Sequence, residues 1–142
     1  MFPLVLRGQA PAAGAAAREL EGVLRAYMAA VDSGNAAAMT DLFANDAQTT
    51  LVEDGEVWRG WAAIRARLDS VAATHRLYGI RLKLGAIDVT ALSSEYALAI
   101  VRYTEMLAPD SQYPRVMTVV FRRTGVRWRG IHVHVSTRPP PE

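Results

Sequence analysis

The sequence predicts an α+β domain in which a cone-shaped, curved antiparallel sheet wraps around three N-terminal helices. The first observation is length, since 142 residues suffice for one domain with a single hydrophobic core. The second is periodicity, because apolar residues recur at helical spacing in the first half and alternate as in strands from residue 79 onward. Helices that precede strands favour an α+β fold with the helices on one face of the sheet.

The first helix is expected to start near Arg18. Residues 10–17, APAAGAAA, are of low complexity and contain proline and glycine, so residues 1–17 are predicted to form a loose lead-in to a single domain spanning 18–137. Gly34 ends the helix, because glycine readily takes the left-handed conformation. An apolar stripe at three- and four-residue spacing identifies the buried side of this helix: Leu20, Val23, Leu24, Tyr27, Met28 and Val31.

Two further helices are predicted before the sheet. Asn35 can cap a short helix that runs through Phe43. Residues 47–52 are expected to be extended and to lead into a solvated acidic turn at 53–55. A third helix begins near Gly60, and its buried stripe consists of Trp61, Ile64, Leu68, Val71 and His75.

Four strands joined by hairpin-length loops are predicted in the second half. They are rich in β-branched and aromatic residues and cover residues 79–90, 95–107, 114–123 and 127–136. The proline-rich tail at 138–142 cannot pair in a sheet and is expected to end the fold.

Composition excludes several classes of function. The formal net charge is only +2 and the basic residues are scattered, so we expect no nucleic-acid partner. No apolar run approaches the roughly 20 residues that span a bilayer, so we expect no membrane partner. The chain has no cysteine, which is compatible with a cytoplasmic location. It also lacks a glycine-rich phosphate loop and a nucleophile elbow, which disfavours phosphoryl transfer and serine hydrolysis. We expect no cofactor.

The segment WRGIHVHVS, residues 128–136, carries the most informative motif. Because strand side chains alternate, His132 and His134 are predicted to share a polar, pocket-lining face with Trp128, opposite an aliphatic face. A catalytic metal site usually needs three protein ligands, and His75 is the only other histidine. We therefore expect no metal.

The order of elements, together with these motifs, resembles the nuclear transport factor 2-like superfamily of cone-shaped domains. The half containing GVLRAYMAAVDSGN, DLFANDA and RGWAAI resembles steroid delta-isomerase and its SnoaL-like polyketide cyclase relatives. The half containing AIVRYTEM, VFRRTGVRW and IHVHVS is similar to the association (hub) domain of calcium/calmodulin-dependent protein kinase and its bacterial SnoaL-like counterparts.

The isomerase resemblance implies one functional residue and removes another. Tyr27 falls where those enzymes place the tyrosine that donates a hydrogen bond to the developing oxyanion. Leu51 falls where they place the aspartate that shuttles the proton, and leucine cannot act as a base. Because loss of a general base costs roughly 10²- to 10⁴-fold in rate, the isomerase route is disfavoured.

The hub resemblance implies a pocket that binds anions. Arg102 falls on a pocket-lining arginine of that branch, and Thr118 stands where the branch often has a second arginine. His132 and His134 fall on its paired histidines. Structural alternatives stay open for each residue. Arg102 could form a salt bridge with Glu105 of a neighbouring chain or with another acid, or could be exposed near a strand end, and Glu105 is expected at an interface. The histidines could simply be satisfied within a core or an interface.

These residues predict a pocket for a small apolar molecule with a carboxylate or carbonyl group. Arg102 would hold the acidic group, His132 or His134 would donate a hydrogen bond, and His134 and Tyr27 are the catalytic candidates. Trp61 would stack on a flat ligand, unless it and Tyr27 are only core residues. Whether the protein is an enzyme stays open; the reaction would be a cofactor-free isomerisation, cyclisation or dehydration next to a carbonyl.

The alternative is a non-catalytic, hub-like oligomerisation module. Ala97, Ala99, Val101 and Tyr103 are predicted to form an outer sheet surface of small and aromatic residues that suits close packing against another copy. In either case we expect a homodimer or a larger homo-oligomer.

Overall fold

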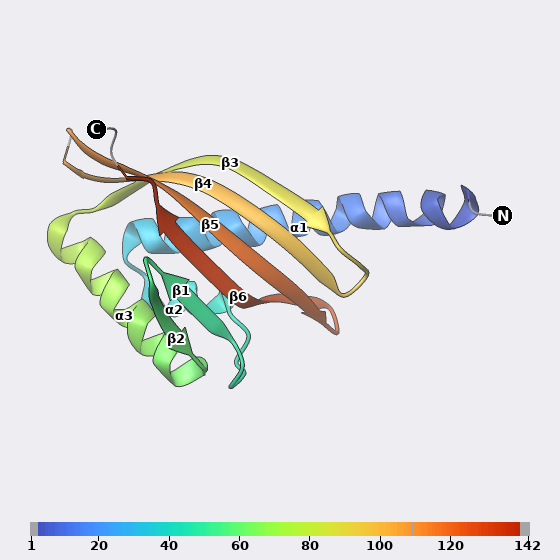
Figure 1. Ribbon diagram of the computed structural model, residues 1–142, viewed down its shortest axis with the longest axis horizontal. Coiled ribbons are helices and arrows are strands. Elements are labelled where there is room, and N and C mark those ends of the chain that lie inside the picture. Colours follow the sequence, from blue (N-terminus) through green and yellow to red (C-terminus); the bar gives the residue numbers. More distant parts are fainter. Residues whose placement is uncertain (1–2, 109, 140–142) are drawn as a thin grey trace.

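The computed structural model describes residues 3–108 and 110–139 and confirms the predicted α+β cone (Figure 1). The helical elements are α1 (Pro3–Ser33), α2 (Ala36–Met39), the 3-10 turn η1 (Thr40–Leu42) and α3 (Trp61–Tyr78). The strands are β1 (Thr50–Glu53), β2 (Glu56–Arg59), β3 (Arg81–Ala91), β4 (Tyr96–Ala108), β5 (Ser111–Thr124) and β6 (Arg127–Thr137).

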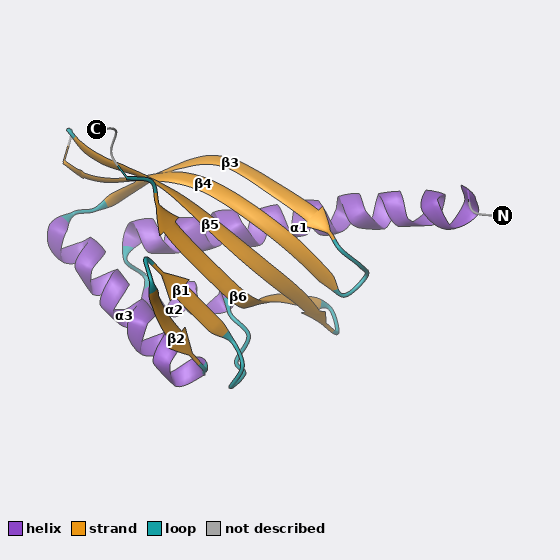
Figure 2. Cartoon of the chain, in the orientation of Figure 1, coloured by secondary structure: helices purple, strands orange, loops and turns teal. Residues whose placement is uncertain are grey.

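All six strands belong to one sheet, in the order β2-β1-β6-β5-β4-β3. Neighbouring strands are antiparallel except for β1 and β6, which pair in parallel. Figure 2 shows the long strands β3 to β6 side by side, with α1 running across one face and α3 beside the short β1–β2 hairpin. The helices cover one face of the sheet, which we call the inner face; the opposite face is the outer face.

The N-terminal helix is longer than the sequence suggested. Residues 10–17 lie within α1, which begins at Pro3, so the expectation of a loose lead-in over residues 1–17 is not met where the structure describes the chain. Alanine has the highest intrinsic helix propensity and dominates this stretch, although Pro11 and Gly14 both disfavour the interior of a helix. Figure 1 shows the N-terminal end of α1 extending past the edge of the sheet.

The other helix boundaries agree closely with the predictions. Gly34 follows α1 with φ of 67°, and the side chain of Asn35 caps α2 by accepting a hydrogen bond from the Ala38 amide at 3.1 Å. Helix α3 starts one residue after Gly60, as expected. β6 ends at Thr137, before the predicted tail, of which residues 140–142 lie outside the described residues.

Strand β2 was not predicted. It is four residues long and mostly exposed, so it carries little of the alternation by which strands are recognised in a sequence. Asp54 and Gly55, both with positive φ, form the tight turn that pairs β2 with β1.

A bulge in β6 decides which side chains face the helices. Val120 pairs with His132 whereas the next residue, Phe121, pairs with Gly130, so Ile131 is an extra residue on β6. Trp128 is therefore buried on the inner face before the bulge. Val133 and Val135 are buried on the same face after it.

The bulge makes the predicted face of the histidines wrong. His132 and His134 lie on the outer face, opposite Trp128, because one extra residue inverts the alternation that follows it. No helix in the described part of the chain is long and apolar enough to cross a membrane.

Candidate functional site

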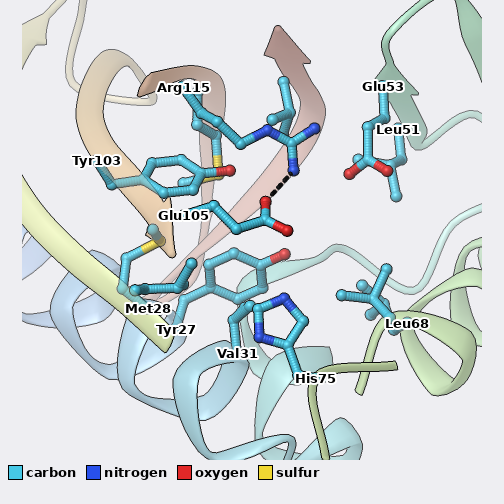
Figure 3. A pocket seen from close by; sticks show the side chains of 14 residues that line it. Tyr27, Met28, Val31, Leu51, Glu53, Leu68, His75, Tyr103, Glu105 and Arg115 are labelled. Atoms are coloured by element: carbon cyan, nitrogen blue, oxygen red, sulfur yellow. Dashed lines mark hydrogen bonds and ion pairs between the residues drawn. The ribbon is translucent and has the colours of Figure 1, made fainter. Parts of the chain in front are cut away.

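A hollow lies between the inner face of the sheet and the helices α1 and α3. It contains about 450 Å³ of space between atoms, its opening to solvent included, but only about 30 Å³ is wide enough for the centre of a water molecule. Most of its wall is apolar and is formed by Met28, Val31, Leu51, Leu68, Val71, Leu82, Met117 and Val135. Polar side chains interrupt this wall, and Figure 3 shows how they are arranged.

Two tyrosines and two glutamates line the hollow. Tyr27 comes from α1, Tyr103 and Glu105 come from β4, and Glu53 comes from β1. In Figure 3 the side chains of Tyr27, Tyr103 and Glu105 lie on one side of the hollow, and Glu53 faces them beside Leu51. Phenol donors and carboxylate acceptors therefore meet around one small space.

Arg115 holds the acidic group of β4 in place. Its guanidinium donates to Glu105 at 2.8 Å and to Asp54 at 2.8 Å, and its Nε donates to Thr137 Oγ1 at 3.1 Å. Only 13% of the Arg115 side chain is exposed, so these charges interact with little screening by solvent. Arg115 thus ties β4, β5, β6 and the β1–β2 turn together at the edge of the hollow.

Glu53 has its own cationic partner. Arg67 on α3 donates a hydrogen bond to Glu53 Oε1, and its guanidinium lies 4.8 Å from the centre of the Trp58 ring. The cation–π contact and the ion pair together fix Arg67 between α3 and the β1–β2 hairpin. One carboxylate oxygen of Glu53 is bound in this way.

The two tyrosines are held in their neutral form. Burial, followed by the proximity of Tyr103 and Glu53, raises the pKa of Tyr27 far above its ordinary value. Burial likewise raises the pKa of Tyr103 well above its ordinary value. Both phenols therefore keep their protons at neutral pH and can donate hydrogen bonds into the hollow.

His75 adds a polar group whose hydrogen bonding is incomplete. It lies in the last turn of α3, lines the hollow and is only 7% exposed. Its Nδ1 atom is buried and has no hydrogen-bond partner among the described residues. Buried polar atoms nearly always have a hydrogen-bond partner, so the Nδ1 atom of His75 is available to a polar group in the hollow.

Of the residues predicted to form the site, Tyr27 alone lies in the hollow. Arg102, Thr118, His132 and His134 all lie on the outer face, where Arg102 and His134 are exposed. The expectation that these four converge on an enclosed pocket with Tyr27 is therefore wrong. Strand register explains the difference, because adjacent residues on a strand point to opposite faces. Buried residues next to these four in the chain occupy the inner positions: Tyr103, Met117, Val133 and Val135.

Two of these side chains have environments of their own. His132 Nδ1 lies 2.6 Å from Thr50 Oγ1, and burial followed by the neighbouring His134 lowers the pKa of His132. Trp61, at the start of α3, is half-buried against the hydrophobic core and does not line the hollow.

The surface predicted to bind another copy also has to be corrected. Ala97, Ala99 and Val101 are fully buried and Tyr103 is 9% exposed, because all four face the helices. Glu105, which was expected at an interface, shares this inner face and lines the hollow.

Sequence reasoning missed most of the polar groups around the hollow. Glu53 was expected in a solvated turn, yet it follows the hollow-lining Leu51 by two residues on the same face of β1. The same spacing of two relates Tyr103 to Glu105. Side chains two residues apart on a strand share a face, so each glutamate could have been found from its inner neighbour. That inference requires knowing which face of the strand is the inner one.

The fold and its hollow define a cone domain of the nuclear transport factor 2-like type. Solved structures with this fold superpose over most of the chain, although sequence identities are low and establish the fold alone. An NTF2-like protein of unknown function from Pseudomonas putida KT2440 is 20% identical with a TM-score of 0.74, covering 87% of each chain. An NTF2-like protein with a cystatin-like fold from Novosphingobium aromaticivorans is 22% identical with a TM-score of 0.71, covering 84% of this chain and 80% of that one.

A third structure is provisionally named a calcium/calmodulin dependent protein kinase II association domain, from Xanthomonas campestris. It is 21% identical with a TM-score of 0.69 and covers 86% of this chain and 87% of its own. No protein of curated function matches the sequence significantly. The family model of the SnoaL-like domain matches residues 20–140, and the chain therefore belongs to the SnoaL-like domain family.

Proposed function

We propose that the hollow binds a small, uncharged molecule through a carbonyl oxygen, with the Tyr27 hydroxyl as donor. Because only about 30 Å³ of the hollow admits the centre of a water molecule, its lining side chains must move apart to accept such a ligand. The observation that carries this proposal is the set of polar groups that line an otherwise apolar cavity, with a His75 nitrogen left unpaired. Burying polar groups costs free energy unless they are hydrogen-bonded. If the hollow served packing alone, apolar side chains in its wall would give a more stable fold. A ligand whose polar atoms form hydrogen bonds with these side chains would explain why polar residues line the hollow.

The balance of charge favours a neutral ligand over a carboxylate. Around the hollow, the carboxylates of Glu53, Asp54 and Glu105 outnumber the guanidiniums of Arg67 and Arg115 by three to two. Both arginines already bind carboxylates, so an anion would meet repulsion without a free cation. This replaces the expectation that an arginine anchors an acidic group of the ligand.

The same groups supply a route for proton transfer next to the carbonyl. Glu53 would accept a proton from the carbon adjacent to the carbonyl, while the Tyr27 hydroxyl donates a hydrogen bond to the enolate oxygen that forms. Return of that proton from Glu53 to a second carbon completes an isomerisation without cofactor. Glu53 would thus provide the carboxylate that Leu51, two residues earlier on the same face, does not.

Titration with a panel of cyclic enones, ketones and phenols tests the binding step. Tyr27→Phe removes only the hydroxyl and is expected to weaken the best ligand about tenfold, the worth of one good hydrogen bond. Tyr113→Phe makes the same change at an exposed position on β5 and should leave affinity unchanged. Equal affinities of the Tyr27 variant and wild type for every ligand would contradict the proposal.

Deuterium exchange at the carbon next to the ligand carbonyl tests the chemical step. Glu53→Gln should slow exchange at least a hundredfold, because an amide cannot act as a base. Glu56→Gln, at the exposed position directly opposite in the β1–β2 ladder, is the matched control. Exchange that is equally fast in both variants would leave the hollow with a binding role only.

A second candidate function, assembly with other copies, is favoured by the outer face. Half-buried apolar side chains lie next to one another there on β4 and β5: Leu98, Ile100, Val116 and Val120. Light scattering that finds a dimer or larger ring in wild type, and a monomer in Ile100→Glu, would support assembly through this face. Wild type that is monomeric at all concentrations would exclude it.

A further inference from the structure

The HVH motif of β6 lies outside the hollow and has no part in the function proposed for it. His132 and His134 are two residues apart after the bulge, so both side chains project from the outer face. Their ring centres are 6.4 Å apart with planes at 80°. His132 is half-buried and His134 is exposed, so solvent and solutes reach the pair.

Thr50 orients one of these rings. Its hydroxyl oxygen lies 2.6 Å from His132 Nδ1, across the parallel β1–β6 pairing in which Thr50 stands opposite His132. When the hydroxyl accepts the Nδ1 proton, the ring adopts the tautomer whose Nε2 atom carries the lone pair. Histidines that bind metals almost always have such a second partner on the other nitrogen, which fixes tautomer and orientation.

The separation of the rings suits chelation. Each nitrogen lies about 2.1 Å from a bound Zn²⁺, so two such nitrogens are at most about 4 Å apart. Nitrogens turned toward each other lie closer together than the ring centres. His134 is exposed and can turn toward the ring that Thr50 holds in place.

The residues around His132 and His134 indicate which metal ions the pair would bind. No group of three or more His, Cys, Asp or Glu side chains in the described part of the chain could hold a metal, so the remaining coordination positions belong to water. Imidazole without carboxylate suits Cu²⁺, Ni²⁺ and Zn²⁺ and does not suit Mg²⁺ or Ca²⁺. The neighbours of the pair on β1 and β5 are uncharged and so do not repel a cation: Thr50, Val52, Thr118 and Val120.

We propose that His132 and His134 chelate one divalent transition-metal ion on the outer face, with Thr50 as the positioning residue. This differs from the three-ligand site that the sequence argued against, because it uses two protein ligands and leaves positions open. It also needs no ligand in the hollow and stands independently of the function proposed there.

Titration of the metal-free full chain with Ni²⁺, Zn²⁺ and Cu²⁺, each against a chromophoric competitor, tests the site. Wild type should bind one ion per chain, in the order of affinity Cu²⁺ above Ni²⁺ and Zn²⁺. His132→Asn and His134→Asn should each weaken binding at least tenfold. Thr50→Val should weaken it about tenfold or more by releasing the His132 ring, whereas Thr118→Val, on the other side of the pair, should bind as wild type.

Electron paramagnetic resonance of the Cu²⁺-loaded wild type provides a readout that does not depend on how the variants fold. The spectrum is expected to show coupling of the Cu²⁺ electron spin to two imidazole nitrogens, one from each histidine. Coupling to a single imidazole nitrogen would overturn the proposal. Absence of stoichiometric binding by wild type, or full affinity in His134→Asn, would also overturn it. A Thr50→Val protein with wild-type affinity would remove the positioning role of Thr50.

Discussion

Polar residues have different partners on the two faces of the sheet: other protein groups on the inner face and water on the outer face. On the inner face, Glu105 is 16% exposed and is neutralised by Arg115, which also binds Asp54. On the outer face, Arg102 of β4 and His134 of β6 project into solvent. An inner polar residue therefore needs a partner of the protein or a ligand, whereas water serves an outer one.

The comparison shows how little separates a hollow-lining residue from a surface residue. Arg102 and Tyr103 are neighbours in the chain, yet the first is exposed and the second is 9% exposed and faces the hollow. On β6, a single extra residue at Ile131 exchanges the roles of histidine and valine. Register, and not residue type, assigns the faces.

Val133→Asp should break the comparison most severely. Val133 is fully buried on the inner face of β6, so a carboxylate at this position would be buried without a partner. We expect a loss of about 3–5 kcal/mol in the free energy of unfolding, which is much of the stability of a typical domain. Urea unfolding measures the effect.

The control is His134→Asp, the same substitution at the next residue of β6, where the side chain is exposed on the outer face. It should cost no more than about 1 kcal/mol. Similar losses in the two variants would contradict the assignment of the two faces of β6.

Arg115→Met tests the inner face next. It leaves the Glu105 carboxylate without its cation in a largely buried position, and we expect a loss of about 3 kcal/mol in the free energy of unfolding. Arg122→Met is the matched change on the same strand, where the ion pair with Asp46 is long, 3.6 Å, and well exposed. It should cost below about 0.5 kcal/mol, and similar losses in the two variants would remove the energetic distinction between the sites.

Arg102→Leu should have the smallest effect. The side chain is exposed on the outer face, so we expect a change in unfolding free energy within about 0.5 kcal/mol and unchanged affinity for any ligand of the hollow. Isothermal titration with the best enone or phenol provides the measurement. Loss of binding in this variant alone would return Arg102 to the ligand site and contradict the face assignment.

Local signals in the sequence were sufficient for most of the fold. The stripe from Leu20 to Val31, the cap at Asn35 and the stop at Gly34 depend on residues within one or two turns of each other, and all three predictions are confirmed. Tyr27 could be placed in the hollow for the same reason, since a helix stripe has one buried side.

The remaining site residues could not be placed from local signals. Glu53 and Arg67 are 14 residues apart and Glu105 and Arg115 are 10 apart, and each pair joins two different elements. No spacing within a single helix or strand therefore predicts these ion pairs. For Glu53 the sequence showed only an acidic turn, which is ordinarily solvated.

The sequence by itself determined the class of fold, the order of the helices and of the four long strands, and the buried side of each helix. The 3.6-residue period of a helix can be recognised without knowing which elements pack against it. Only the tertiary structure decided which face of β4, β5 and β6 is inner, because a strand with apolar residues on both faces has no local preference and a one-residue bulge inverts the pattern. That decision moved His132, His134 and Arg102 outward and brought Tyr103, Glu105 and Arg115 to the hollow.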